Sequence, residues 1–300
     1  MSYYLGVDLG STTAKSVIVD QAANVVASQV VQMGAVSRAG LAKSMAGALE
    51  AAGLAEGDIA GTVATGYGRR LVPGVGRTFT EITCHARGVA ALVPGTRLVI
   101  DIGGQDSKAI RIDGDGIVEN FAMNDRCASG TGRFFEVLAR ALECDIADLA
   151  DLALTGDRDL EVSSMCATFA ETEIISLLAR GERREDIAAS VHRAVAARTL
   201  GLVAQVRKSE PVVMTGGVAK NAAAVRFLEQ TLDLPVTVPA TPQITGAYGA
   251  ALLARDTGRG GRVDDDPVTE QRAESPADCT SCSAYAPAPG ARPLLPLHPR

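Results

Sequence analysis

The sequence is short of the residues that mark several classes of protein. It contains no tryptophan, aromatic residues make up 4% of its 300 positions, and only three residues are histidine. Stacking of nucleic-acid bases and an aromatic ligand cage therefore match the composition poorly. The formal net charge of −6 and the pI near 5.2 also argue against nucleic acid as a partner.

Long apolar runs and an export signal are lacking too. No stretch approaches the roughly 18 to 20 uncharged apolar residues of a membrane span. The first residues, Met1 to Tyr4, carry no basic region typical of a signal peptide. We therefore expect a cytoplasmic protein with no membrane partner. In that setting the six cysteines are better explained as reduced thiols or metal ligands than as disulfides.

What the sequence does contain is a globular part followed by a tail of different composition. Hydrophobic residues make up 47% of the chain and charged residues 21%, enough for a sizeable core. Residues 256–300 hold seven of the thirteen prolines and show no apolar periodicity. We expect this segment to be a disordered tail. Its single pair, Cys279 and Cys282, is weak evidence for a zinc site.

Strand-like and helix-like segments alternate through the globular part, and their order starts again near residue 97. The patterns predict strands at 3–7, 14–20, 25–32, 61–64, 97–101, 108–112, 116–122, 211–214 and 236–238. They predict helices at 41–52, 81–92, 132–142, 169–180, 185–206, 222–232 and 246–254.

The restart is visible residue by residue. The segment from Asp8 to Asp20 aligns without a gap with the segment from Asp101 to Asp113, and the Asp, Gly, Lys and final Asp positions coincide. This duplication predicts two similar α/β lobes that face each other across a cleft, over residues 1–93 and 94–255. The helix at 246–254 is a candidate to pack back on the first lobe.

Each copy of the repeat reads strand, Asp-x-Gly turn, strand. Glycine lets the backbone approach a ligand, and small hydroxyl residues add donors beside free N–H groups. The carboxylates of Asp8 and Asp101 suit Mg²⁺ bound through water. An ordinary hairpin would explain one copy, but two copies in register favour phosphate binding. We assign phosphate contacts to Gly10, Ser11, Thr12, Thr13, Lys15, Gly103 and Gly104.

A third glycine turn completes a nucleotide site. Gly216, Gly217 and Asn221 lie between a predicted strand and helix and would face adenosine. The order of the three turns resembles the actin, hexokinase and Hsp70 ATPase superfamily, which implies a duplicated α/β fold with two lobes around a nucleotide cleft. A P-loop with its lysine is missing. Gln105, in the second loop, cannot act as a base but can orient a water, which favours hydrolysis over phosphoryl transfer.

Two cysteines stand just before predicted helix starts. Cys127 precedes the helix at 132–142, and Cys166 precedes the helix at 169–180. A helix N-terminus lowers the pKa of a thiol, and two thiolates are half of a Cys₄ iron–sulfur site. A twofold dimer could supply the other half. The alternative, that each is a small buried hydrophobe, stays open at this point.

The other cysteines and histidines of the globular part are expected to be structural. Cys84 and Cys144 lack the placement before a helix. We expect His85 to be a polar residue with satisfied hydrogen bonds rather than a ligand. We expect His192 to lie on the surface of its helix.

Seven stretches together resemble the activators of 2-hydroxyacyl-CoA dehydratases. These activators belong to the BadF/BadG/BcrA/BcrD ATPase group, which includes the ATPase subunits of benzoyl-CoA reductase. The resemblance runs from about Tyr3 to Ala254 and leaves out the tail. The stretches are 5–15, 65–69, 101–108, 124–134, 163–173, 214–221 and 246–252.

The resemblance implies a homodimer that shares one [4Fe-4S] cluster, with ligands at the positions of Cys127 and Cys166. Each subunit would bind ATP or ADP with Mg²⁺. Hydrolysis would drive one low-potential electron to a partner 2-hydroxyacyl-CoA dehydratase, and reduced ferredoxin or flavodoxin would refill the cluster. The sequence names neither the acyl-CoA nor the cluster potential.

Other classes of function stay open. An ATPase subunit permanently bound in a benzoyl-CoA-type reductase would differ in its copurifying subunits. A hexokinase-like small-molecule kinase predicts a phosphorylated product and no iron, so the paired cysteines and Gln105 count against it. A nucleotide-dependent structural or chaperone-like module predicts no redox chemistry and gives no reason for the two cysteines.

Overall fold

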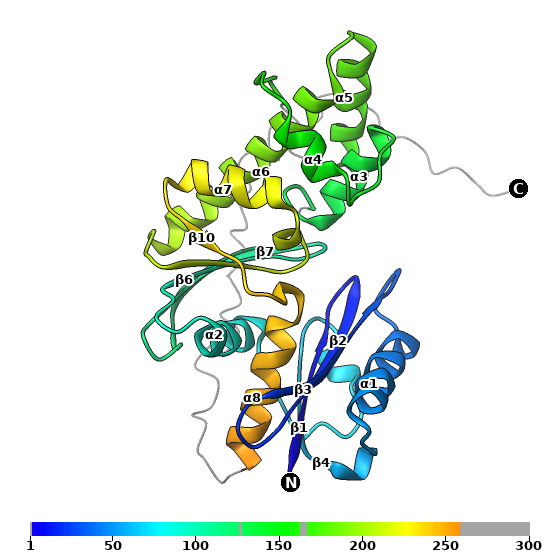
Figure 1. Cartoon of the computed structure of the whole chain (residues 1–300), viewed down its shortest axis with the longest axis vertical. Helices are drawn as coiled ribbons and strands as arrows, with labels where there is room; N and C mark the ends of the chain where they lie inside the picture. Colours follow the sequence, from blue (N-terminus) through cyan, green and yellow to red (C-terminus); the bar gives the residue numbers. More distant parts are fainter. Residues whose placement is uncertain (1, 126–127, 163–166, 259–300) are drawn as a thin grey trace, which may run out of the picture. The chain divides into compact units, whose positions relative to one another are not determined.

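The computed structural model describes residues 2–125, 128–162 and 167–258. Within them the strands form two five-stranded sheets, shown in Figure 1. The first sheet has the order β3-β2-β1-β4-β5 and the second has the order β8-β7-β6-β9-β10. Their bounds are β1 Tyr3–Leu9, β2 Thr13–Val19, β3 Val25–Gln32, β4 Ile59–Thr65, β5 Arg77–Thr78, β6 Leu98–Ile102, β7 Ser107–Ile112, β8 Val118–Asn124, β9 Val212–Thr215 and β10 Val236–Thr237.

The helices follow the predicted order, with one addition. α4 was not expected, because its six residues are too few to show a helical period. None of the helices described here is long and apolar enough to cross a membrane. The bounds are α1 Arg38–Ala52, α2 Glu81–Leu92, α3 Gly132–Ala141, α4 Leu149–Leu154, α5 Ala167–Ala179, α6 Arg184–Val206, α7 Ala222–Leu232 and α8 Thr245–Gly258.

The two sheets repeat one topology. In each, a three-stranded antiparallel meander is extended by two parallel strands. Asp8 of β1 lies opposite Lys15 of β2, and Asp101 of β6 lies opposite Lys108 of β7. The predicted duplicated α/β fold is therefore confirmed, down to the register of its Asp and Lys positions.

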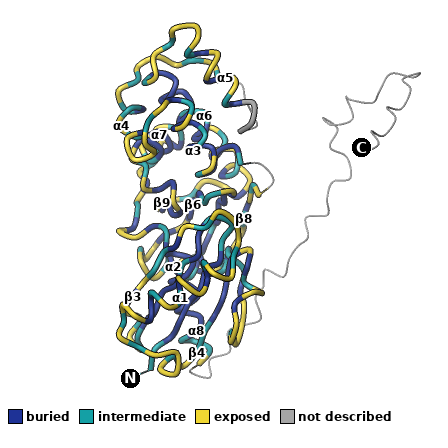
Figure 2. Tube along the Cα trace, turned by 90° about the vertical axis from the view of Figure 1, so that its right-hand side faces the viewer, coloured by how far each residue is buried: buried dark blue, intermediate teal, exposed yellow. Residues whose placement is uncertain are grey.

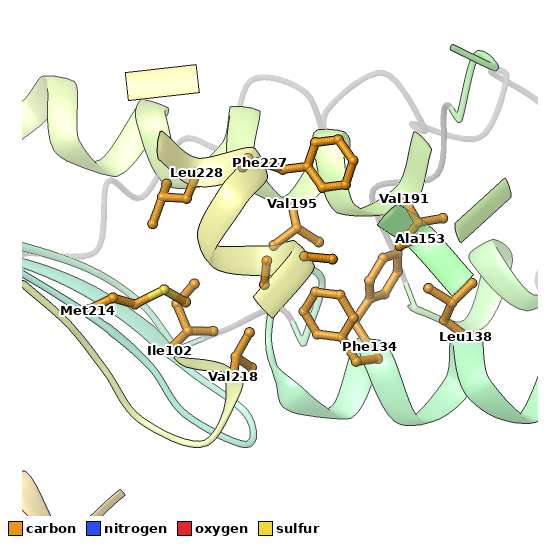
Figure 3. Close-up of a cluster of buried hydrophobic side chains, with 14 of the residues drawn as sticks. Ile102, Phe134, Leu138, Ala153, Val191, Val195, Met214, Val218, Phe227 and Leu228 are labelled. Carbon is orange, nitrogen blue, oxygen red and sulfur yellow. The ribbon is translucent and has the colours of Figure 1, made fainter. Parts of the chain in front are cut away.

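Both faces of each sheet are covered by helices. On the first sheet, α1 packs on the face that carries Leu5 and Val7, and α8 packs on the opposite face. On the second sheet, the face with Leu98 and Ile100 meets α3, α4, α6 and α7, as Figure 3 shows for part of this cluster. Figure 2 shows the same pattern as buried strands under helices with exposed outer faces. Burial on both faces explains why β6 and β9, two inner strands of the second sheet, are nearly continuous apolar runs.

Helices α2 and α8 cross at glycines. A methyl group on Gly88 would lie 2.3 Å from the carbonyl oxygen of Thr245, and one on Gly249 would lie 1.8 Å from the carbonyl oxygen of Cys84. These contacts are reciprocal, and only glycine permits such a close approach of two backbones. The crossing fixes the position of α2 beside the first turn of α8.

The lobe ranges expected from the sequence divide the helices differently from their packing. The range 1–93 contains α2, but Ile82 and Val89 of that helix pack on Val99 and Ile110 of the second sheet. The range 94–255 contains α8, which packs on the first sheet. α8 also continues through Gly258, past the expected start of the tail at residue 256. Residues 259–300 lie outside the described residues.

Candidate active site

A cavity of about 470 Å³ is lined by residues from both halves of the duplicated fold. The structure brings together there nearly all the residues predicted for nucleotide binding, from three glycine turns. Gln105 is the exception, because its side chain is exposed and it is not among the lining residues. The predicted residues that line the cavity are Asp8, Gly10, Ser11, Thr12, Thr13, Lys15, Asp101, Gly103, Gly104, Gly216, Gly217 and Asn221.

The two glycine hairpins have the same local structure. The Gly10 N–H donates to the Thr13 carbonyl at 3.0 Å, and the Gly103 N–H donates to the Asp106 carbonyl at 2.9 Å. The hairpins approach each other closely, because a methyl group on Gly104 would lie 2.2 Å from Oγ1 of Thr12. A side chain at position 104 would thus collide with the first loop.

Each half contributes an ion pair between an aspartate and a lysine, and we call these the two Asp–Lys pairs. In the first, Lys15 Nζ donates to Asp8 Oδ2 at 2.7 Å. Burial acts to lower the pKa of Lys15, but the Asp8 carboxylate outweighs it and raises that pKa. Lys15 therefore stays a cation beside the first loop.

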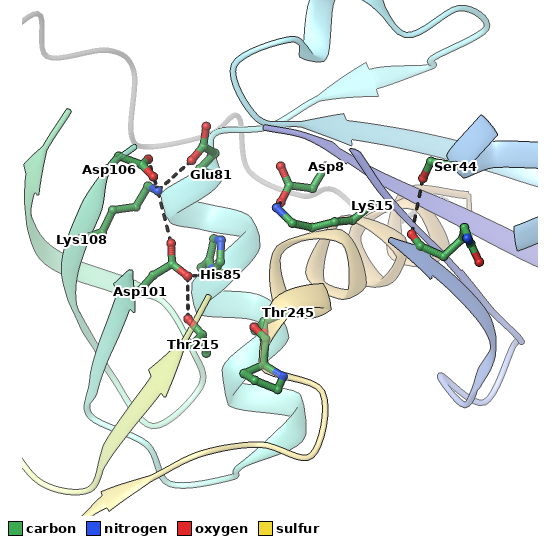
Figure 4. A network of polar contacts seen from close by, with 12 residues as sticks. Asp8, Lys15, Ser44, Glu81, His85, Asp101, Asp106, Lys108, Thr215 and Thr245 are labelled. Atoms are coloured by element: carbon green, nitrogen blue, oxygen red, sulfur yellow. Dashed lines mark hydrogen bonds and ion pairs between the residues drawn. The ribbon is translucent and has the colours of Figure 1, made fainter. Parts of the chain in front are cut away.

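The second Asp–Lys pair is more elaborate. Lys108 is 2% exposed, and its ammonium contacts Asp101 at 3.3 Å, Asp106 at 2.5 Å and Glu81 at 2.8 Å (Figure 4). The three carboxylates raise the pKa of Lys108 well above its usual value, although burial opposes them. One buried ammonium is thus shared by three carboxylates.

Asp101 and Asp106 respond differently to this shared charge. Burial acts to raise the pKa of Asp101, but His85, Lys108 and a hydrogen bond from Thr215 Oγ1 at 2.9 Å bring that pKa down to about 2. For Asp106, burial and the neighbouring carboxylates outweigh Lys108, so its pKa is raised. Asp101 is the firmly ionised carboxylate of the site.

Sequence reasoning missed the contribution of α2. Glu81 and His85 both line the cavity and lie one helical turn apart. The only sequence signal for this contribution was the spacing of Glu81 and His85, which places both on one face of a largely apolar helix. The expectation that His85 is a satisfied polar residue is wrong, because its buried Nδ1 has no hydrogen-bond partner among the described residues.

The second glycine loop is tied to the start of α3. The N–H of Gly132 donates to the Gly103 carbonyl at 2.8 Å, and the N–H of Arg133 donates to the Gly104 carbonyl at 2.9 Å. The hydroxyl of the fully buried Thr131 donates to the Gly104 carbonyl at 3.0 Å. Any movement of this loop is therefore passed to α3.

The two cysteines predicted to bind a cluster, Cys127 and Cys166, lie outside the described residues. The described chain does fix the helices that follow them. α3 begins at Gly132, and α5 begins at Ala167. Cys84 is buried and Cys144 is partly buried, and neither lines the cavity.

The far end of the cavity is more apolar and is braced by a buried histidine. Phe135 lines this end, and its ring lies 4.7 Å from the ring of His192. The expected surface position of His192 is wrong, because this side chain is 1% exposed. Its Nδ1 donates to the Ala188 carbonyl at 2.7 Å, so Nε2 accepts from the Asn221 amide at 3.0 Å. Burial lowers the pKa of His192 to about 4.

The donor set suits a divalent cation that arrives with phosphates. Within residues 2–125, 128–162 and 167–258, no group of three or more His, Cys, Asp or Glu side chains could hold a metal ion by itself. Mg²⁺ ordinarily takes one or two carboxylates and completes its shell with water and phosphate oxygens. Asp8 and Asp101, on the two sides of the cavity, fit that requirement.

Comparison with known proteins agrees with this geometry. Residues 5–254 match the BadF/BadG/BcrA/BcrD ATPase family. The chain belongs to this family. It is 47% identical to the activator of lactoyl-CoA dehydratase from Anaerotignum propionicum, over 84% of this chain and 97% of the relative. It is 43% identical to the (R)-2-hydroxyglutaryl-CoA dehydratase activating ATPase from Acidaminococcus fermentans, over 84% of this chain and 96% of the relative.

A solved structure of a family member has the same fold. The activator of the 2-hydroxyisocaproyl-CoA dehydratase from Clostridium difficile, with bound ADPNP, superposes with a TM-score of 0.82 at 40% identity. The match covers 86% of this chain and 96% of that chain. That relative binds an ATP analogue. The cavity lined by three glycine turns in the present structure is of the kind expected to bind such a nucleotide.

Proposed function

We propose that this protein is an ATP-hydrolysing activator that delivers one low-potential electron to a 2-hydroxyacyl-CoA dehydratase. The observation that carries the proposal is its likeness to two named dehydratase activators over nearly their whole length. The cavity supports the nucleotide part of this function, since residues of both repeats converge on it.

In this proposal the two loops hold the phosphates of ATP. Backbone N–H groups of the glycine turns and the Lys15 ammonium would bind phosphate oxygens. Asp8 and Asp101 would hold Mg²⁺ through water. Gly216 and Gly217 would lie against the adenosine, beside the apolar end of the cavity. Gln105 is proposed to orient the attacking water, and this role needs its exposed side chain to turn toward the cavity.

The electron-transfer part rests on Cys127 and Cys166. We propose that these thiolates, from each of two copies of the chain, hold one [4Fe-4S] cluster at the twofold axis. Such a cluster supplies a low-potential electron when bound. The hydrogen bonds from the first turn of α3 to Gly103 and Gly104 would link nucleotide binding to the segment that follows Cys127.

The proposed partners follow from the same likeness. A reduced ferredoxin or flavodoxin would donate the electron, and the dehydratase would receive it. The choice of acyl-CoA would belong to the dehydratase, because this proposal assigns the cavity described here to ATP.

Anaerobic purification with analysis of iron, sulfide and mass tests the proposal. We expect about four irons per dimer. Cys127→Ser and Cys166→Ser should lose the iron but still bind ATP, because the proposal assigns the nucleotide contacts to other residues. Cys144→Ser is the matched control and should keep the iron, since Cys144 packs against the core of the second half.

Two results would contradict the proposal. One is a protein without iron, even after anaerobic reconstitution, that still binds ATP. The other is full iron content in the Cys127→Ser or Cys166→Ser variant. The first would return the function to a kinase or an ATP-gated module, and the second would reject the ligand assignment alone.

A further inference from the structure

His85 is a buried polar group of the cavity to which the proposed roles assign no task. His85 is 6% exposed, and its buried Nδ1 has no hydrogen-bond partner in the part of the chain that the structure describes. Buried polar atoms in proteins are nearly always paired, so an unpaired one needs a reason. The surroundings of the ring supply that reason.

His85 faces Asp101, as Figure 4 shows. Its Nδ1 lies 3.5 Å from Asp101 Oδ1, the same oxygen that accepts from Thr215 at 2.9 Å. The other oxygen, Oδ2, faces the Lys108 ammonium at 3.3 Å. The Asp101 carboxylate is thus approached from β9, β7 and α2. A shift of roughly 0.5 Å would bring the His85 contact within hydrogen-bond range.

The internal repeat has a histidine at this position in one half only. In the reciprocal crossing of α2 and α8, Cys84 and Thr245 occupy equivalent positions. The residues that follow them are His85 and Gly246. A methyl group on Gly246 would lie 2.9 Å from Nε2 of His85, so glycine leaves room for the imidazole. The second Asp–Lys pair therefore has an imidazole where the first has only a hydrogen atom.

We propose that His85 is a positioning residue for nucleotide chemistry, with an Nδ1–H that donates to Asp101 and orients its carboxylate toward the cavity. This inference rests on the proposed ATP hydrolysis. A hydrogen bond to an ionised acceptor is stronger than one between neutral groups, and this holds for a neutral or a charged imidazole. Because the donor comes from α2, the orientation of Asp101 depends on the position of that helix.

Three substitutions identify which ring nitrogen matters. His85→Asn places an amide N–H near the position of Nδ1, His85→Gln places one near Nε2, and His85→Ala removes both. We expect kcat for ATP hydrolysis to fall about ten-fold or more in His85→Ala and His85→Gln. His85→Asn should stay within about three-fold of wild type, because it restores the donor to Asp101. Cys84→Ser, the preceding buried residue of α2, is the matched control and should keep its kcat.

The outcomes separate this inference from the proposed function. Unchanged kcat in His85→Ala, or rescue by Gln in place of Asn, overturns the inference and leaves the function standing. Equal losses of kcat and Tm in all four variants would show a structural role and also overturn it. A wild-type protein that does not hydrolyse ATP overturns the proposed function and this inference with it.

A spectroscopic measurement needs no variant. Two-bond correlation spectra of full-length protein with ¹⁵N-labelled histidine distinguish an imidazole protonated at Nδ1 from one protonated at Nε2. We expect His85 to carry its proton at Nδ1, the same tautomer that the Ala188 carbonyl imposes on His192. A proton at Nε2 of His85 would overturn the inference.

Discussion

At the scale of single residues, Lys108 organises the charges of the cavity. Its ammonium is the nearest cation to Asp101, Asp106 and Glu81, and it is almost completely buried. Buried ion pairs contribute little net stability, but removing one partner leaves uncompensated charge. Lys15, in the equivalent position of the first half, neutralises one carboxylate and is more exposed.

Lys108→Met should therefore destabilise the protein strongly. We expect the free energy of unfolding at pH 7 to fall by about 3–5 kcal/mol, because three carboxylates remain with no cation among them. Lys15→Met, the matched substitution in the first half, should cost less. Urea denaturation measures both losses. If the two variants lost equal free energy of unfolding, the sharing of one ammonium by three carboxylates would make no extra contribution to stability.

The sequence predicted those residues of this site that lie at matching positions of the internal repeat. Asp101 was assigned to the site because it coincides with Asp8 in the aligned segments, whereas Lys108, which coincides with Lys15, was given no role. Glu81 and His85 were missed, because a single polar residue on a helix carries no sign of what it faces. Gln105 was selected by its chemistry, and whether a loop side chain points inward depends on a hairpin conformation that composition does not determine.

At the scale of secondary-structure elements, the crossing of α2 and α8 sets the geometry of the cavity. Gly88 and Gly249 let the two backbones touch, which brings Glu81 and His85 beside the loops. The sequence predicted α2 with its observed bounds and predicted α8 as the shorter range 246–254. The packing of α8 on the first sheet was expected, but the packing of α2 on the second sheet was not, because an apolar face does not say which sheet it covers.

Gly249→Ala should separate the two helices. Its methyl group would lie 1.8 Å from the Cys84 carbonyl, so the backbone must shift, and we expect a loss of about 1–3 kcal/mol or more. Gly201→Ala in α6 is the control, because a methyl group there meets nothing within 4 Å. That variant should gain about 1 kcal/mol from helix propensity alone. Thermal and urea unfolding measure the stability change of each variant. This account would be contradicted if both variants lost stability or both gained it.

His192 makes the stability of α6 and its neighbours depend on pH. Its folded pKa of about 4 lies below the ordinary value of 6.5, so between these values the unfolded chain binds a proton that the folded chain does not. Stability contributed by the neutral ring is fully present above pH 6.5 and is lost as pH falls toward 4. The expected loss is about 3 kcal/mol in total.

Urea unfolding between pH 7 and pH 4.5 measures this effect. His192→Asn keeps an N–H near Nδ1 but does not titrate, so its stability should fall less steeply with decreasing pH than that of wild type. The baseline stability of the variant at pH 7 is expected to be lower, and only the slope is diagnostic. Parallel slopes for the two proteins would assign the pH dependence to other groups.

At the scale of the whole molecule, nucleotide binding should depend on residues 2–258 alone. The family match ends at residue 254, and every described residue that lines the cavity precedes it. A ligand that binds only the folded state raises Tm with its concentration. A chain ending at residue 258 should therefore show the same rise of Tm with ADP as the full chain. A smaller rise would mean that residues 259–300 take part in binding.

The duplication is the part of the architecture that could be predicted most completely, because aligned residues such as Asp20 and Asp113 show it directly. The distribution of helices between the two sheets could be predicted only in part: the return of α8 to the first lobe was expected, but the packing of α2 on the second sheet was not, since it depends on contacts distant in sequence. α2 follows the strands of the first sheet yet packs on the second, and α8 follows the strands of the second yet packs on the first.

This exchange has a consequence for the origin of the chain. A single ancestral copy of the repeat would have carried the helix suited to its neighbour's sheet and left its own sheet bare on one face. It could bury that face only against a second copy, in a domain-swapped pair. Gene fusion would then have joined two halves that already depended on each other, freeing one of them to acquire an imidazole while the other kept a glycine.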